Sequence, residues 1–145
     1  EEIKNFESKW EKLICNEDFI IQEFQNNIID KGEVAVMLFG GQYTHSVIKK
    51  AKSGDFRVQD DFGGSVENYQ PSKEMIALAK EAIKQLKPTP AYARVDIIWD
   101  NESKIAVSEL ELIEPELWFR FNEIAADKLA AEIKDFLKNL TSSWN

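Results

Sequence analysis

The stretch Ser108-Glu109-Leu110-Glu111-Leu112-Ile113-Glu114-Pro115 decides the fold, because acidic and apolar residues alternate along it. Successive side chains of a strand point to opposite faces of a sheet. Glu109 and Glu111 therefore share one face, and Leu110 and Leu112 share the other. The pattern predicts a strand that buries its leucines and presents two carboxylates together.

A second strand precedes this stretch and adds a third carboxylate. Residues Tyr92 to Asp100 alternate in the same way, and the polar turn Asp100 to Lys104 joins them to the acidic strand as a hairpin that brings Asp96 beside Glu109 and Glu111. Three close carboxylates repel one another unless a cation neutralises them. Hard oxygen ligands suit Mg²⁺, which also binds nucleotide phosphates. The spacing indicates a metal site, although the solvated face of an ordinary amphipathic hairpin would carry similar acids.

The composition indicates one domain of modest size. With 145 residues, of which 43% are hydrophobic and 11% aromatic, the chain has enough apolar material for a single core. The net charge of -8 argues against a nucleic-acid partner, since proteins that bind phosphate backbones carry basic patches. No apolar run approaches the roughly 20 residues of a membrane helix, and no signal-peptide core is present. We therefore expect no membrane partner and a cytoplasmic location.

The remaining pattern predicts an α+β fold, an antiparallel sheet with flanking helices, because most of the strands are linked as hairpins. In chain order, apolar spacing and turn residues predict a helix over Ile3–Ile14, a strand at Phe19–Phe24, a hairpin over Gly32–Lys50 that turns at Gly40-Gly41, a loop over Ser53–Ser65, a helix over Ser72–Leu86, the acidic hairpin over Tyr92–Ile113 and a helix over Asn122–Leu140.

Cations gather just before and within the loop Ser53 to Ser65 in an otherwise acidic chain. Lys49, Lys50 and Lys52 precede the loop, and Arg57 lies within it, six residues before the pair Gly63-Gly64. Ammonium and guanidinium groups clamp phosphoryl oxygens, and paired glycines let backbone N–H groups approach a ligand or let a flap close. The segment indicates an anion site, and an exposed surface loop with routine lysines is the alternative interpretation.

Short motifs follow one another along the chain in the order Gln22-Glu23-Phe24, Gly32-Glu33, Lys49, Gly54-Asp55-Phe56-Arg57-Val58-Gln59, Gly63-Gly64, Arg94-Val95-Asp96 and Glu109-Leu110-Glu111 ending at Pro115. In this order they resemble the ATP-grasp ligases, in particular the glutathione-synthetase and ribosomal-modification branch. The runs Gly-Asp-Phe-Arg-Val-Gln and Glu-Leu-Glu-Leu-Ile-Glu-Pro also resemble the cycloserine-biosynthesis ligases of that superfamily. The resemblance covers nearly the whole chain and implies the C-terminal half of an ATP-grasp fold.

The resemblance implies a role for each matching residue. The linker that reads adenine is matched by Gln22, Glu23, Phe24 and Gln25, and the acid that holds the ribose by Glu33. Lys49 and Arg57 match the cations that face the ATP phosphates and the acyl-phosphate. Gln59 matches an amide near the metal, and Gly63 and Gly64 match a closing loop. The Mg²⁺ ligands, with Mn²⁺ as an alternative metal, are matched by Asp96, Glu109 and Glu111, the last in place of the usual Asn.

The resemblance implies ATP- and Mg²⁺-dependent ligation of a small carboxylate to an amine through an acyl-phosphate. In such ligases an N-terminal domain and two further strands of the ATP cleft precede the adenine linker, and this chain begins just before that linker. We therefore expect residues 1–145 to form a single C-terminal domain of a longer enzyme, inactive alone. The alternative is a non-catalytic acidic interaction module whose open sheet pairs with a partner or with a second copy.

Overall fold

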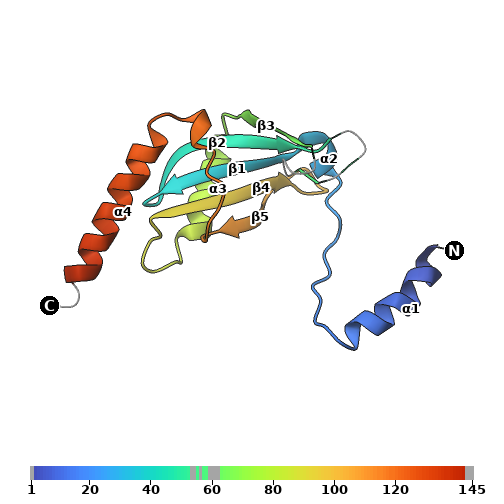
Figure 1. Ribbon diagram of the computed structural model, residues 1–145. Helices are drawn as coiled ribbons and strands as arrows, with labels where there is room; N and C mark the ends of the chain where they lie inside the picture. The colour runs from blue at the N-terminus through green and yellow to red at the C-terminus, as the bar shows by residue number, and fades with distance from the viewer. Residues whose placement is uncertain (1, 53–54, 56, 59–62, 143–145) are drawn as a thin grey trace.

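The computed structural model describes residues 2–52, 55, 57–58 and 63–142, and an antiparallel sheet of five strands lies at its centre (Figure 1). The α+β fold and the antiparallel sheet expected from the sequence are confirmed. The strands lie in the order β3-β2-β1-β4-β5, where β1 is Glu33–Phe39, β2 Gln42–Lys50, β3 Ser65–Asn68, β4 Tyr92–Trp99 and β5 Ile105–Glu111. The helices are α1 (Glu2–Ile14), α2 (Asn27–Lys31), α3 (Lys73–Ile83) and α4 (Ala125–Ser142), and Phe119–Phe121 form one turn of 3-10 helix.

The first hairpin turns at the two glycines that the sequence indicated. Gly40 and Gly41 have φ angles of 53° and 78°, and the register pairs Phe39 with Gln42. A two-residue hairpin turn with positive φ at both positions matches the twist of the flanking strands, and glycine adopts it without steric penalty. The second hairpin, β4–β5, is also confirmed.

One face of the sheet packs against α3. Ser72 caps this helix, since its hydroxyl accepts a hydrogen bond from the Met75 backbone N–H at 3.2 Å. Leu110 and Leu112 pack against the same core, as the alternation in β5 predicts. The buried residues of this core are Val34, Val36, Leu38, Ile48, Met75, Ala79, Ile83, Ala93, Val95 and Ile97.

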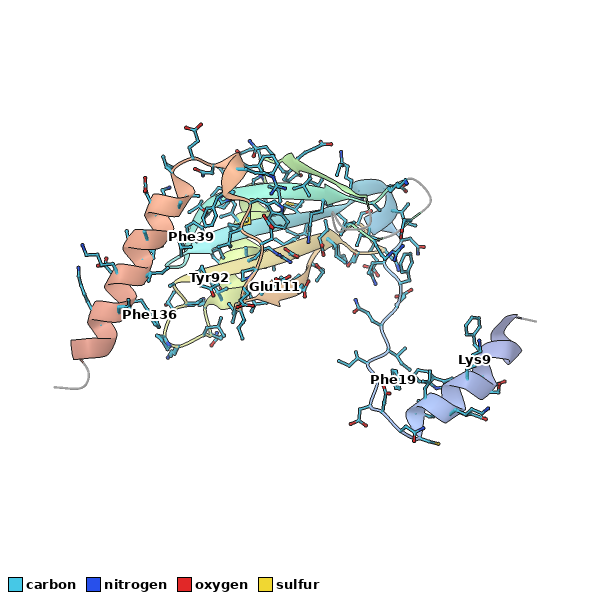
Figure 2. The ribbon with its side chains drawn as sticks, in the orientation of Figure 1. Lys9, Phe19, Phe39, Tyr92, Glu111 and Phe136 are labelled. Carbon is cyan, nitrogen blue, oxygen red and sulfur yellow. The ribbon has the colours of Figure 1, made fainter. Side chains whose placement is uncertain are left out.

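The opposite face is covered at one end by the chain that follows β5 and by the start of α4. Phe39 and Tyr92 lie at the end of the sheet nearest α4 (Figure 2), where Leu117, Trp118 and Ala125 complete a second core cluster. The same face continues toward the start of β1, where its residues change from apolar to charged. This change divides the face into an apolar part and a candidate site.

His45 joins β2 to the covering segment. Its Nε2 atom lies 2.9 Å from the Leu117 carbonyl oxygen, which can only accept, so Nε2 carries the proton. The Thr44 hydroxyl lies 3.1 Å from the other ring nitrogen. Burial lowers the pKa of His45, so the ring is neutral at pH 7. The only histidine of the chain is a structural residue of the second core cluster.

The strand expected at Phe19–Phe24 is wrong. Residues 18–25 are extended but pair with no strand among the described residues, and Ile20 and Ile21 are 98% and 79% exposed. An apolar run forms a strand only where a neighbouring strand accepts its backbone hydrogen bonds. Trp10 of α1 instead packs against Phe19, with ring centroids 5.2 Å apart, and Phe19 lies away from the sheet (Figure 2).

The predicted helices agree in position but not in burial. The last helix begins at Ala125 rather than at residue 122, and two residues of its expected apolar stripe, Ile133 and Leu137, are 40% and 55% exposed. In Figure 1, α4 extends beyond the sheet, so the sheet covers only part of its apolar side. None of the helices in the described ranges has the length and apolarity needed to cross a membrane.

Candidate functional site

The three predicted metal ligands converge on the charged part of the sheet. Glu109 is directly opposite Asp96 in the β4–β5 register, and Glu111 is opposite Arg94. One carboxylate oxygen from each of Asp96, Glu109 and Glu111 lies within 4.8 Å of the others. The sequence therefore placed the three carboxylates correctly on one face.

Two cations already neutralise part of this charge. The guanidinium of Arg94 donates to both oxygens of Asp96, at 2.9 Å each, and also to Glu111. Lys49 Nζ lies 2.7 Å from Asp96 and 2.6 Å from Glu33. Asp96 is fully buried, and its two cationic partners offset the cost of placing a carboxylate there. The pattern of acids alone did not reveal this pairing.

The pairing also determines the proton affinity of Arg94. Burial by itself would lower the pKa of Arg94, but the nearby carboxylates of Asp96, Glu111 and Glu109 outweigh burial and raise it. Arg94 therefore stays charged at every pH of interest. Arg94 is thus a permanent cation that is hydrogen-bonded to two of the predicted metal ligands, Asp96 and Glu111.

Glu109 differs from the other acids of the cluster. No cation lies within ion-pair distance of its carboxylate among the described residues. Partial burial, followed by repulsion from Glu111 and Asp96, raises the pKa of Glu109. The arrangement thus leaves one carboxylate without a partner at the exposed edge of an anionic cluster.

The cluster fits a hard divalent cation. Asp96 accepts three hydrogen bonds, which leaves about one of its roughly four acceptor positions for a metal, and Glu109 has both oxygens available. Carboxylate oxygens at this spacing are the ligands that Mg²⁺ and Mn²⁺ prefer. Asp96, Glu109 and Glu111 could hold such an ion.

Glu109 and Glu111 line a cleft of about 360 Å³. Gly32, directly before Glu33, requires glycine, because its φ is 76° and its close approach to the Lys49 carbonyl leaves no room for a Cβ atom. Arg57 reaches the cleft and is paired with Asp55 at 2.6 Å. The cleft is lined by Ile28, Glu33, Lys49, Arg57, Val58, Arg94, Glu109 and Glu111.

A second cleft, of about 320 Å³, lies beside the segment expected to read adenine. Ile28 lines both clefts, and Ser108 links them because its hydroxyl lies 2.6 Å from the Glu33 carboxylate. Glu33, the expected ribose residue, is also bound to Lys49. The second cleft is lined by Gln22, Glu23, Phe24, Gln25, Ile28, Ile98 and Ser108.

Two other predicted residues are described and one is not. Gly63 has a φ of 79°, which favours glycine, and Gly64 follows it directly before β3. Neither glycine lines the two clefts as the described residues form them. Gln59 lies outside the described residues.

Arg94 and Trp118 are site residues to which the sequence assigned no role. Arg94 Cζ and Lys49 Nζ lie 5.2 Å and 5.8 Å from the centre of the Trp118 ring, within the range of cation–π attraction. Trp118 has a φ of 42°, unusual for a bulky residue. Only the i, i+2 spacing of Arg94 and Asp96 could have signalled that the two side chains share a face.

The antiparallel sheet and its flanking helices match part of an ATP-grasp fold. Residues 3–117 match the RimK-like ATP-grasp domain, and the chain belongs to that family. No curated protein sequence matches the chain.

The solved structures that are similar to this one include two ligases. D-cycloserine synthetase DcsG is 26% identical, with a TM-score of 0.62 over 80% of this chain and 41% of its own. D-alanine–D-alanine ligase from Bacillus anthracis, solved in complex with ATP, is 17% identical, with a TM-score of 0.59 over 98% of this chain and 49% of its own. The chain thus spans less than half the length of either ligase.

Proposed function

We propose that this chain is the C-terminal part of an ATP- and Mg²⁺-dependent ligase that joins a small carboxylate to an amine through an acyl-phosphate. The observation that carries the proposal is the convergence of Asp96, Glu109 and Glu111 beside two linked clefts, in a chain of the ATP-grasp family. The similarity to DcsG supports the same class of reaction.

Phosphoryl transfer explains why the cluster contains both acids and cations. A carboxylate is a poor electrophile, so transfer of the ATP γ-phosphoryl group onto it provides a leaving group that the amine then displaces as phosphate. A bound Mg²⁺ would neutralise charge on the phosphates. Lys49, Arg57 and Arg94 line the same cleft and would stabilise the charge on the transferring oxygens.

Each end of the nucleotide has a proposed site. The linker residues Gln22 to Gln25 would hold the adenine in the second cleft, which adjoins the charged cleft through Ile28. Glu33 lies between the two clefts, where a ribose would join base and phosphates. The pair Gly63-Gly64 would close over the phosphates and exclude water from the acyl-phosphate, and Gln59 would supply an amide near the metal.

The test is phosphate release from ATP by the full encoded protein, supplied with Mg²⁺ and panels of small carboxylates and amines. We expect release that requires both co-substrates and Mg²⁺, and that falls about 10²–10³-fold in Arg57→Ala, because a guanidinium on the transferring charge acts mainly in the transition state. Lys138→Ala, a lysine remote from the clefts, serves as the control. Metal-independent release, or full activity in Arg57→Ala, would contradict the proposal.

A further inference from the structure

The turn between β4 and β5 is hydrogen-bonded to the linker that lines the second cleft. Asn101 Nδ2 donates to the Phe24 carbonyl at 3.0 Å, and its Oδ1 accepts from the Asn26 backbone N–H at 2.8 Å. The Asn101 backbone N–H donates to Gln25 Oε1 at 3.0 Å. One residue of the turn therefore contacts three consecutive residues far away in the sequence.

The turn is rigid enough to act as a support. Asp100 Oδ1 accepts from the backbone N–H groups of Glu102 and Lys104, at 2.9 Å and 2.8 Å, and the Asp100 N–H donates to the Lys104 carbonyl at 2.8 Å. Aspartate side chains commonly fix turns in this way. These bonds hold the turn in shape and leave the side chain and the backbone N–H of Asn101 to face the linker.

Two further contacts fasten α2 to the same turn. The Asn27 side chain donates to the Asp100 carbonyl, and Lys31 Nζ donates to the Ser103 hydroxyl at 3.0 Å. Lys31 also lies 5.8 Å from the centre of the Trp99 ring. The chain on both sides of Asn26 is therefore attached to the β4–β5 hairpin.

The chemistry of Asn101 matches this task. A primary amide is a donor and an acceptor on one short arm, whereas a carboxylate can only accept. The Phe24 carbonyl needs a donor, and the Asn26 N–H needs an acceptor. Residues 18–25 lie in no strand of the sheet, so side-chain hydrogen bonds take the place of a strand ladder here.

We propose that Asn101 is a positioning residue for the base of the nucleotide. The hairpin carries Asp96, Glu109 and Glu111 in its strands and Asn101 in its turn, so it fixes the distance between the phosphate end and the base end of the site. The proposal rests on the proposed function, since it assigns a nucleotide to the two clefts.

The test compares a ligand that has a base with one that lacks it. Binding of Mg²⁺-ATP and of Mg²⁺-tripolyphosphate is measured by calorimetry on the full encoded protein and on Asn101→Ala and Asn101→Asp. We expect both variants to weaken ATP binding roughly tenfold, as the loss of one or two neutral hydrogen bonds implies, and to leave tripolyphosphate binding within about twofold. Glu102→Ala, in the same turn but without a bond to the linker, is the control.

Hydrogen exchange at the backbone amide of Asn26 gives an independent measurement. Exchange there should accelerate in Asn101→Ala and stay unchanged in Glu102→Ala. Equal weakening of both ligands, or no weakening of either, would overturn the role of Asn101 while the ligase proposal stands. If the unaltered protein binds ATP no more tightly than tripolyphosphate, the base adds nothing to binding, and both proposals fail at the base site.

Discussion

Arg94 forms a bidentate pair with Asp96, two positions further along the same strand: its Nε donates to one carboxylate oxygen and a terminal nitrogen donates to the other, both at 2.9 Å. Residues i and i+2 of a strand share a face, and the planar fork of arginine matches the geometry of a carboxylate. The pair fixes the orientation of the one fully buried acid of the cluster.

Removal of Arg94 should therefore destabilise the fold as well as the site. Arg94→Ala leaves Asp96 with Lys49 as its remaining cation, and we expect the free energy of unfolding to fall by about 3–5 kcal/mol. Arg94→Lys should lose less free energy of unfolding than Arg94→Ala, because an ammonium group keeps the charge but not the planar, two-pronged geometry of the guanidinium. Urea unfolding measures both variants. Arg120→Ala, which breaks an exposed pair with Glu116, should change stability by less than about 0.5 kcal/mol, and a comparable loss there would refute the argument.

Glu109→Gln should have opposite effects on metal binding and on stability. Without Mg²⁺ the change removes repulsion from Glu111 and Asp96, so the free energy of unfolding should rise by about 0.5 kcal/mol at pH 7. With Mg²⁺ the variant should bind the ion about tenfold more weakly.

The ionisation of Glu109 also determines how the stability of the protein depends on pH. Because the pKa of Glu109 is raised in the folded state, the native protein retains this proton to a higher pH than the unfolded chain, and stability falls as pH rises above about 4.5. The Gln variant should lack that component. Thermal unfolding between pH 4 and 8 checks it, with Glu116→Gln as an exposed control, and a less stable variant at pH 7 would count against it.

Leu110→Ala should lower the free energy of unfolding by about 2 kcal/mol, because the Leu110 side chain lies on the other face of β5 from Glu109 and Glu111 and packs on the α3 core. Val107→Ala on the same strand is the matched control, since Val107 is 39% exposed and should cost less than about 0.5 kcal/mol. Equal losses in the two variants would mean that β5 does not separate a core face from a charged face.

His45 predicts a loss of stability in mild acid. Its pKa is lowered in the folded state, so below pH 6.5 the unfolded chain takes up the proton first and stability falls with pH, by at most about 1.4 kcal/mol per pH unit. His45→Gln can still donate to the Leu117 carbonyl but does not titrate. Denaturant unfolding at pH 5 and pH 7 should show a smaller difference in this variant than in the native sequence.

Local patterns in the sequence predicted the hairpins and the shared face of the acids, since both depend on the period of a strand. The pairing of Lys49 with Asp96 could not be predicted in this way. Lys49 is two strands away and reaches Asp96 across β1, so their contact depends on the order of the strands. The register shift that inserts Ser108 between the Asp96–Glu109 and Ile97–Val107 pairs is likewise a property of the assembled sheet.

Short or unpaired segments explain the errors. Helix α2 has only five residues, Asn27–Lys31, too few for a helical period to be visible. The apolar run Phe19–Phe24 has the composition of a strand, but composition does not supply a neighbouring strand. In the candidate site, the three acids could be located from the sequence, but the ion pair that joins Lys49 to Asp96 across β1 could not.

The order of the strands also has a consequence for the folding pathway. β1–β2 and β4–β5 are hairpins between sequence neighbours, whereas the β1–β4 pairing closes a long loop, and we expect this non-local step to be slower than the formation of either hairpin. The first hairpin pairs Glu33 with Lys49 within itself. The second carries three carboxylates against one guanidinium, and Lys49 reaches Asp96 only when the hairpins dock. Docking therefore forms the hydrophobic core and completes the ionic cluster in the same event.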